Sequence, residues 1–174
     1  VYLYPISNGA ETAGLATTTS PSAGLPTLPA GYGYYLYVGA MRCDGSQNLL
    51  RTLQFGRKTR YKSPPLPTVQ SGSTGSVTVP TYTSTAVADF VPLTASIITL
   101  VVNDANGAVL IAPNNSYGAY NSSTNPPPGG APNNNGTGGG NAHDIFLEGS
   151  NIFIANNASA GRVLCYGWED YFVN

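Results

Sequence analysis

The chain has 174 residues, of which only 9% are charged, and its formal net charge is −1. A chain of this length buries roughly 70% of its unfolded surface, so it needs neither a structural metal nor a disulfide framework to fold. The low charge and the abundance of Gly, Pro, Ser, Thr and Asn disfavour a cytosolic enzyme and a nucleic-acid-binding protein, and they are typical of a rigid extracellular or virion β protein.

Short strands separated by turn signals are predicted along the whole chain. Gly or Pro interrupts nearly every window of a dozen residues, so no helical period is established. Turns are expected at Asn8-Gly9, Asp44-Gly45, Asn106-Gly107 and Gly149-Ser150, and "SIITLVVNDANGAVLIAP" is the clearest predicted hairpin. The sequence predicts one all-β domain over residues 1–174, an antiparallel β-sandwich of jelly-roll type. The expected strands are 1–6, 13–19, 34–42, 49–55, 59–62, 76–79, 83–90, 96–103, 109–111, 144–148, 152–155 and 163–168.

A tyrosine-rich strand follows the proline-containing segment "LPTLPAG". Alternation predicts that Tyr34, Leu36 and Val38 face one side of this strand, and that Tyr35 and Tyr37 face the other. Both faces are aromatic or apolar, which allows two interpretations. The strand is covered on both sides within the sandwich, or Tyr35 and Tyr37 form an exposed ledge that contacts sugars or another protein chain.

The order of several segments carries a resemblance. The opening "VYLYPI", the segment "LPTLPAGYGYYLYVGAMRCDGSQNLL" and the closing "GRVLCYGWEDYFVN" together resemble a group of bacteriophage tail and prophage proteins. The resemblance implies a non-enzymatic structural or attachment protein on the phage particle surface, such as a tail-fibre or receptor-binding domain. A head fibre or a capsid decoration protein is the alternative within this class. The opening on Val1 indicates a processed product or the distal part of a longer polypeptide.

The same resemblance implies partners. A homo-oligomer, commonly a trimer, is expected of such particle parts, and the near-zero net charge favours association of identical copies. Other virion proteins and host cell-surface glycan are the further partners that the resemblance implies. Membrane insertion is not expected, because the sequence has no run of about 18 apolar residues.

Candidate catalytic residues are few. His143 is the only histidine, and we expect it to be a solvated turn residue. Asp144 with Glu148, and Glu169 with Asp170, are the carboxylate pairs that a competing function, degradation of surface polysaccharide, would need. We predict structural roles for both pairs and therefore no catalytic residue. No metal site or cofactor is expected either, since a single histidine rules out a His-rich zinc site.

Basic residues gather in the segment "FGRKTRYK". Lys58, Arg60 and Lys62 would share one face of a strand and form a cationic ridge. The ridge would contact an anionic glycan, a lipopolysaccharide phosphate or an acidic patch on a neighbouring subunit. Alternatively, it would protect an edge strand against aggregation.

A long surface loop is expected at 113–143, which is rich in Asn, Pro and Gly. It holds too few apolar residues to order itself, and Tyr117 and Tyr120 are its only sizeable anchors. We expect the two tyrosines to contact a neighbouring subunit or another virion protein. The alternative is a loop that packs only on its own domain.

The two cysteines, Cys43 and Cys165, permit one disulfide or none. A bridge between them would close a long loop and add a few kcal/mol of stability. Both cysteines lie among apolar residues, so a pair of unbonded thiols is the simpler expectation.

Overall fold

The computed structural model describes residues 1–62, 64–103, 107–131 and 140–171. These residues form antiparallel sheets and one short 3₁₀ helix, and no α-helix occurs among them, which confirms the all-β prediction. The elements are β1 (Tyr2–Ser7), β2 (Thr12–Thr17), η1 (Pro21–Ala23), β3 (Tyr34–Tyr35), β4 (Gly39–Ala40), β5 (Thr52–Phe55), β6 (Lys58–Tyr61), β7 (Thr68–Ser71), β8 (Thr83–Ala86), β9 (Ala95–Asn103), β10 (Val109–Ala112), β11 (Gly129–Ala131), β12 (Asn141–Phe146), β13 (Asn151–Asn156) and β14 (Arg162–Asp170).

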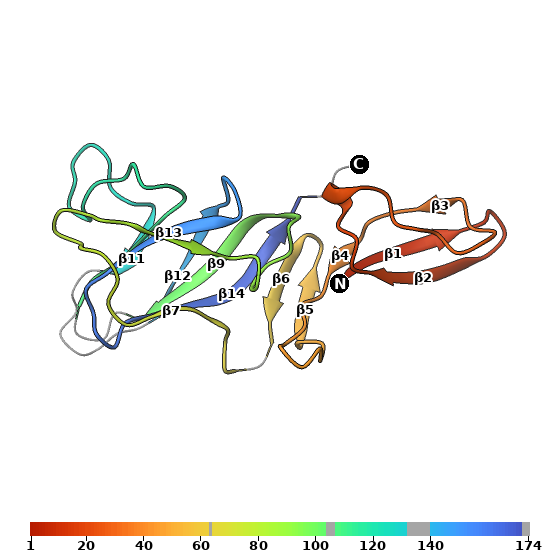
Figure 1. Ribbon diagram of the computed structural model, residues 1–174, viewed down its shortest axis with the longest axis horizontal. Helices are drawn as coiled ribbons and strands as arrows, with labels where there is room; N and C mark the ends of the chain where they lie inside the picture. Colours follow the sequence, from red (N-terminus) through yellow and green to blue (C-terminus); the bar gives the residue numbers. More distant parts are fainter. Residues whose placement is uncertain (63, 104–106, 132–139, 172–174) are drawn as a thin grey trace.

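The first four strands form a sheet of their own, the N-terminal sheet. β1 pairs with β2 on one side and with β3 and β4 on the other. The β1–β2 hairpin closes where the Asn8-Gly9 signal predicts it, because Asn8 Oδ1 accepts hydrogen bonds from the N–H groups of Ala10 (2.9 Å) and Glu11 (2.7 Å). Figure 1 shows this sheet extending from one end of the remaining structure, so the molecule is elongated.

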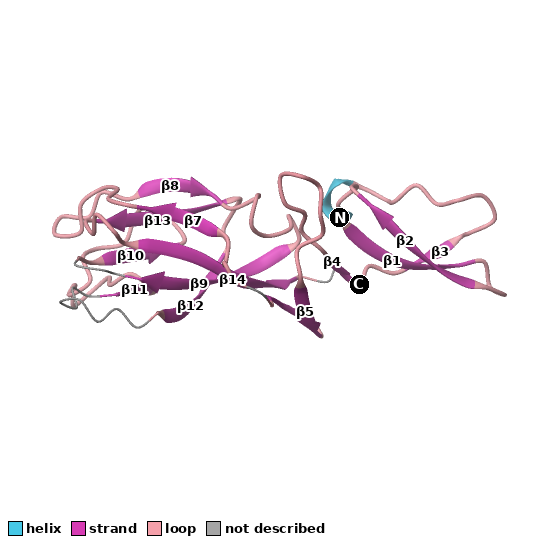
Figure 2. Cartoon of the chain, turned by 90° about the horizontal axis from the view of Figure 1, so that it is seen from below, coloured by secondary structure: helices cyan, strands magenta, loops and turns pink. Residues whose placement is uncertain are grey.

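The other strands build two sheets, which we call the two-sheet body. One sheet has the order β12-β9-β14-β6-β5, with β7 also paired to β14, and the other has the order β11-β10-β13-β8. Figure 2 shows both sheets at the end of the molecule away from β1 and β2, and we refer to the two sheets as layers. Apolar side chains from both layers form one buried cluster, so the layers share a core. Its members include Ile98, Leu100 and Val102 of β9, Val109 and Ile111 of β10, Ile152 and Ile154 of β13, and Val163, Cys165 and Trp168 of β14.

The predicted hairpin between residues 96–103 and 109–111 is wrong, although both strands exist. β9 pairs with β12 and β14, whereas β10 pairs with β11 and β13 in the opposite layer. The chain crosses between the layers here because Ile98 and Leu100 of β9 and Ile111 of β10 all face the shared core. Residues 104–106, which include Asn106 of the predicted turn, lie outside the described residues.

Other strand predictions also need correction. Residues 76–79 lie in a turn, and β7 and β11 were not expected. The predicted strand 34–42 is divided into β3 and β4, and between them the N–H groups of Leu36 and Val38 donate to carbonyls of β1. Cys43 and Cys165 are free thiols, which confirms the expectation that the two cysteines are not bonded to each other.

Several direct contacts attach the N-terminal sheet to the body, and one of them is the hydrogen bond between Tyr37 and Thr94 that is described below. The backbone N–H of Leu93 donates to the hydroxyl of Tyr2 (3.3 Å), and Gln54 Nε2 donates to the carbonyl of Val38 (2.8 Å). Tyr2, Tyr4 and Ile6 of β1 form a second buried cluster, separate from that of the body. The N-terminal sheet therefore has its own small core and is held to the body at one end.

Candidate functional site

The tyrosine-rich strand has the two faces that alternation predicts. Tyr35 and Tyr37 lie on the face of β1 that carries Tyr4, and ring centroids are 6.1 Å apart for Tyr4–Tyr35 and 5.6 Å for Tyr4–Tyr37. Tyr34 is opposite Ser7 in the β-sheet register, and the Leu36 N–H donates to the Pro5 carbonyl. The strand belongs to the N-terminal sheet, so the interpretation that the two-sheet body covers both of its faces is wrong.

A cleft opens beside Tyr35 and Tyr37. Its volume is about 390 Å³, within the size range of small-ligand sites. Tyr4, Tyr35, Leu36 and Tyr37 line it from the sheet, and Pro21, Gly24, Leu25 and Pro26 line it from the segment after β2. We call this the aromatic cleft. None of the residues that line it carries a charge, so a ligand would be held there by ring stacking and apolar contact.

The proline-containing wall of the cleft is fixed by local hydrogen bonds. Ser20 caps η1, since its hydroxyl accepts the Ser22 N–H (3.3 Å) and also contacts the Ser22 hydroxyl (2.8 Å). Pro21 is the first residue of this turn, where its fixed φ is favourable, and Gly24 leaves the turn at φ +137°. Leu25 is 74% exposed on this wall, and Tyr35 is 40% exposed on the sheet, so both sides of the cleft are open to a ligand.

Tyr37 is held at the base of the cleft by a buried chain of hydrogen bonds. Its hydroxyl lies 2.9 Å from Thr94 Oγ1, which donates in turn to Asp170 Oδ1 (2.7 Å). Because the single Thr94 proton is given to Asp170, Tyr37 is the donor to Thr94. Burial raises the pKa of Tyr37 above its usual range and keeps the phenol protonated. This chain connects the cleft to β14 and fixes one of the three tyrosines.

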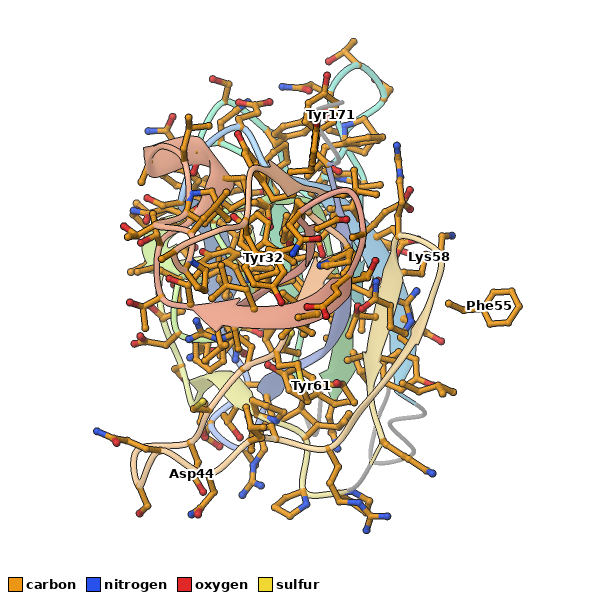
Figure 3. All side chains as sticks on the ribbon, turned by 90° about the vertical axis from the view of Figure 1, so that its right-hand side faces the viewer. Tyr32, Asp44, Phe55, Lys58, Tyr61 and Tyr171 are labelled. Atoms are coloured by element: carbon orange, nitrogen blue, oxygen red, sulfur yellow. The ribbon has the colours of Figure 1, made fainter. Side chains whose placement is uncertain are left out.

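The predicted cationic ridge is partly neutralised within the chain. Lys58 Nζ lies 3.8 Å from Glu169, Arg57 forms a shorter ion pair with the same carboxylate (2.7 Å), and the Arg60 guanidinium lies over the Tyr166 ring at 5.4 Å. Lys62 is exposed just beyond β6. Figure 3 shows Lys58 on the same side of the molecule as Phe55.

The edge-protection interpretation of this ridge is wrong, because β6 lies between β14 and β5 and is not an edge strand. The edge is β5, where the apolar side chains of Leu53 and Phe55 are 62% and 89% exposed. Binding of an anionic partner by Lys58, Arg60 and Lys62 remains a prediction.

The loop that carries Tyr117 and Tyr120 is more ordered than its composition predicts. The Gly118 N–H donates to the Asn125 carbonyl (2.8 Å), and the Tyr82 hydroxyl donates to the Gly118 carbonyl (3.1 Å). The predicted bounds 113–143 are too wide, because residues 129–131 form β11, which pairs with β10, and residues 141–143 belong to β12. Tyr120 is 49% exposed and remains available to a partner, whereas Tyr117 is half-buried. Residues 132–139 of the predicted loop lie outside the described residues.

The predicted carboxylate pairs do not form a facing pair in the structure. Glu169 is bound to Arg57 at the surface, whereas its neighbour Asp170 is buried against Thr94. Asp144 accepts a hydrogen bond from Thr99, and Glu148 accepts one from Asn114. Each carboxylate therefore has a partner other than its predicted counterpart.

His143 is not the solvated turn residue that we expected. It lies in β12 and is half-buried, next to Gly129 of β11. Burial lowers the pKa of its imidazole, which favours the neutral form.

Among the described residues, no group of three or more His, Cys, Asp or Glu side chains is arranged to hold a metal ion. Within the same ranges, no helix has the length and apolar character needed to span a bilayer. Comparison of the chain with protein-family models, curated proteins and solved structures found no match.

The sequence identified only part of the aromatic cleft. Tyr35 and Tyr37 were predicted from the density of tyrosines, but Tyr4, Pro21 and Leu25 were not. The proline-containing segment after β2 signals an extended wall, yet no local pattern specifies which strand that wall lies beside. The cleft is therefore a product of the tertiary fold.

Proposed function

We propose that this chain is a non-enzymatic structural and attachment protein of a bacteriophage particle, with a tail-fibre or receptor-binding role. The observation that carries the proposal is the aromatic cleft, which lies in a small sheet at one end of an elongated, low-charge β structure. A module of this form exposes the cleft to a target surface while the rest of the chain connects to the particle. Two layers with one shared core support a sandwich, and the jelly-roll connection order is part of the proposal.

The chemistry of the cleft favours host-surface glycan with neutral sugar units as the target. Tyrosine rings stack on the C–H face of a sugar ring, and their hydroxyl groups form hydrogen bonds at its rim. The cleft supplies three tyrosines and two prolines without a charged side chain. An anionic target is less well matched, because Lys58 and Arg60 lie on the two-sheet body and already have partners within the chain.

Binding to whole bacterial cells and to their purified neutral surface polysaccharide tests the proposal. We expect saturable binding without a decrease in polysaccharide length. The variant Tyr35→Ala should weaken binding by about 10-fold or more, since aromatic anchors contribute most to such contacts. Tyr171→Ala is a matched control, because Tyr171 is 59% exposed and does not line the cleft.

Two results would change the assignment. Equal binding by wild type and Tyr35→Ala would remove the cleft as the attachment site, and shortening of the polysaccharide would favour the degrading enzyme instead. Immunogold labelling of particles that carry the chain would distinguish a tail fibre from a head fibre or a capsid decoration protein.

A further inference from the structure

The face of the N-terminal sheet opposite the aromatic cleft is apolar and uncovered among the described residues. We call it the outer face, and its members are Leu3, Pro5, Gly14, Ala16, Tyr34, Leu36 and Val38. They line two adjoining hollows that share Pro5, with volumes of about 560 Å³ and about 260 Å³, and the polar residues Ser7 and Thr12 border the smaller one. Tyr34 and Leu36 are 68% and 57% exposed. A contiguous apolar face of this kind in a folded chain marks an interaction site.

The charge distribution indicates which partner fits the outer face. Glu11 is the only charged side chain in residues 1–41, and it lies in the β1–β2 turn and lines neither hollow. A partner recognised by charge has no counterpart on this face. A second copy brings an equally neutral face, so no like-charge repulsion opposes its approach.

The shape of the outer face also suits a copy of itself. Tyr34 and Leu36 project on the β3 side of β1, whereas Gly14 and Ala16 of β2, which lack large side chains, leave the sheet low on the other side of β1. Each copy therefore carries both the projection and the recess that would receive it. Such self-complementarity is what contacts between identical subunits require.

The free edge of the sheet extends this surface. β2 pairs only with β1 among the described strands, and it contains no Pro, Lys, Arg or bulge. These are the features that usually protect an edge strand from pairing with another chain. Because this edge is unprotected and adjoins an apolar face, we expect the N-terminal sheet to be covered within an assembly.

We propose that the outer face of the N-terminal sheet is covered by a second copy of this chain, so that the sheet forms the self-association surface. The aromatic cleft lies on the opposite face, shares only Leu36 with the outer face and stays accessible in this arrangement. The proposal does not depend on the attachment role, because the two use different faces and have different readouts.

Light scattering coupled to size-exclusion chromatography tests the proposal on the whole chain. Wild type should be an oligomer at micromolar concentration, well above the single-chain mass of 18.0 kDa. The double variant Gly14→Arg/Ala16→Arg should raise the dissociation constant by at least about 100-fold, because like charges facing each other across an interface are strongly unfavourable. The fold should tolerate both changes, since Ala16 is exposed and a Cβ at Gly14 has no neighbour within 4 Å.

Phe55→Arg is the control, since it places one arginine on the most exposed large apolar side chain of the two-sheet body. It should leave the oligomer unchanged. Circular dichroism and Trp168 fluorescence would verify that each variant is folded. Hydrogen exchange in residues 12–17 should slow with concentration in wild type and not in the double variant. A monomeric wild type, an unchanged oligomer in the folded double variant, or dissociation by Phe55→Arg alone would overturn the proposal.

Discussion

Replacing Thr94 with valine should destabilise the chain by about 2–4 kcal/mol. The substitution keeps the shape of the side chain but removes the hydroxyl that donates to Asp170 (2.7 Å) and accepts from Tyr37 (2.9 Å). A hydrogen bond to a charged group contributes about 1.5–3 kcal/mol, and a neutral one contributes about 0.5–1.5 kcal/mol. Thr94 is 9% exposed and Asp170 is fully buried, so water cannot easily replace the lost donor.

Urea unfolding followed by tryptophan fluorescence measures this effect. Trp168 is the only tryptophan, it is buried in the core of the two-sheet body, and it lies two residues from Asp170. Thr12→Val is a suitable control, because Thr12 is exposed on β2 and the same change there should alter stability by less than about 0.5 kcal/mol. If Thr94→Val were no more destabilising than this control, the buried hydrogen-bond chain would not hold the sheet and body together as we argue.

Three further results are expected. Burial raises the pKa of Asp170 above its ordinary 3.8. The free energy of unfolding of wild type should therefore fall, relative to that of Asp170→Asn, as the pH rises from about 3.8 towards the raised pKa. A difference between the two proteins that stays constant with pH would contradict this. Gly75→Ala should lower the stability measured by thermal unfolding by about 2 kcal/mol or more, because Gly75 has φ +65° and a Cβ there would lie close against the Thr81 carbonyl, whereas Gly14→Ala should have little effect. Alkylation followed by mass spectrometry should add one label to the native chain, at half-exposed Cys43, and a second label only after denaturation, since Cys165 is buried and burial raises its pKa to about 12; two labels on the native chain would refute this.

The sequence was most informative where structure is local. The turn at Asn8-Gly9 and the alternation of Tyr34 to Val38 were predicted correctly, because a hairpin signal and a period of two act over a few residues. Which strands pair with each other could not be predicted in the same way. β9 and β10 are both strongly apolar, and their sequences do not show whether they pair with each other or face each other across a core.

The candidate site shows the same division. Tyr35 and Tyr37 could be identified from composition, but their cleft depends on Leu25 and Pro26, which reach it through the path of the chain after β2. Tyr37 also depends on Thr94 and Asp170, which are distant in sequence. No local rule connects these positions, since the contact arises from how the N-terminal sheet attaches to the body.

The position of β14 in its sheet has a consequence for synthesis of the chain. β14 pairs with β9, β6 and β7, so the middle of the larger sheet is formed by the strand that leaves the ribosome after all its neighbours. Until residue 170 has emerged, the apolar faces of β9 and β10 lack Val163, Cys165 and Trp168 from their shared core. The body therefore completes its core only after synthesis of β14, and a ribosome-bound chain that stops before β14 should be cleaved by proteases and bound by chaperones.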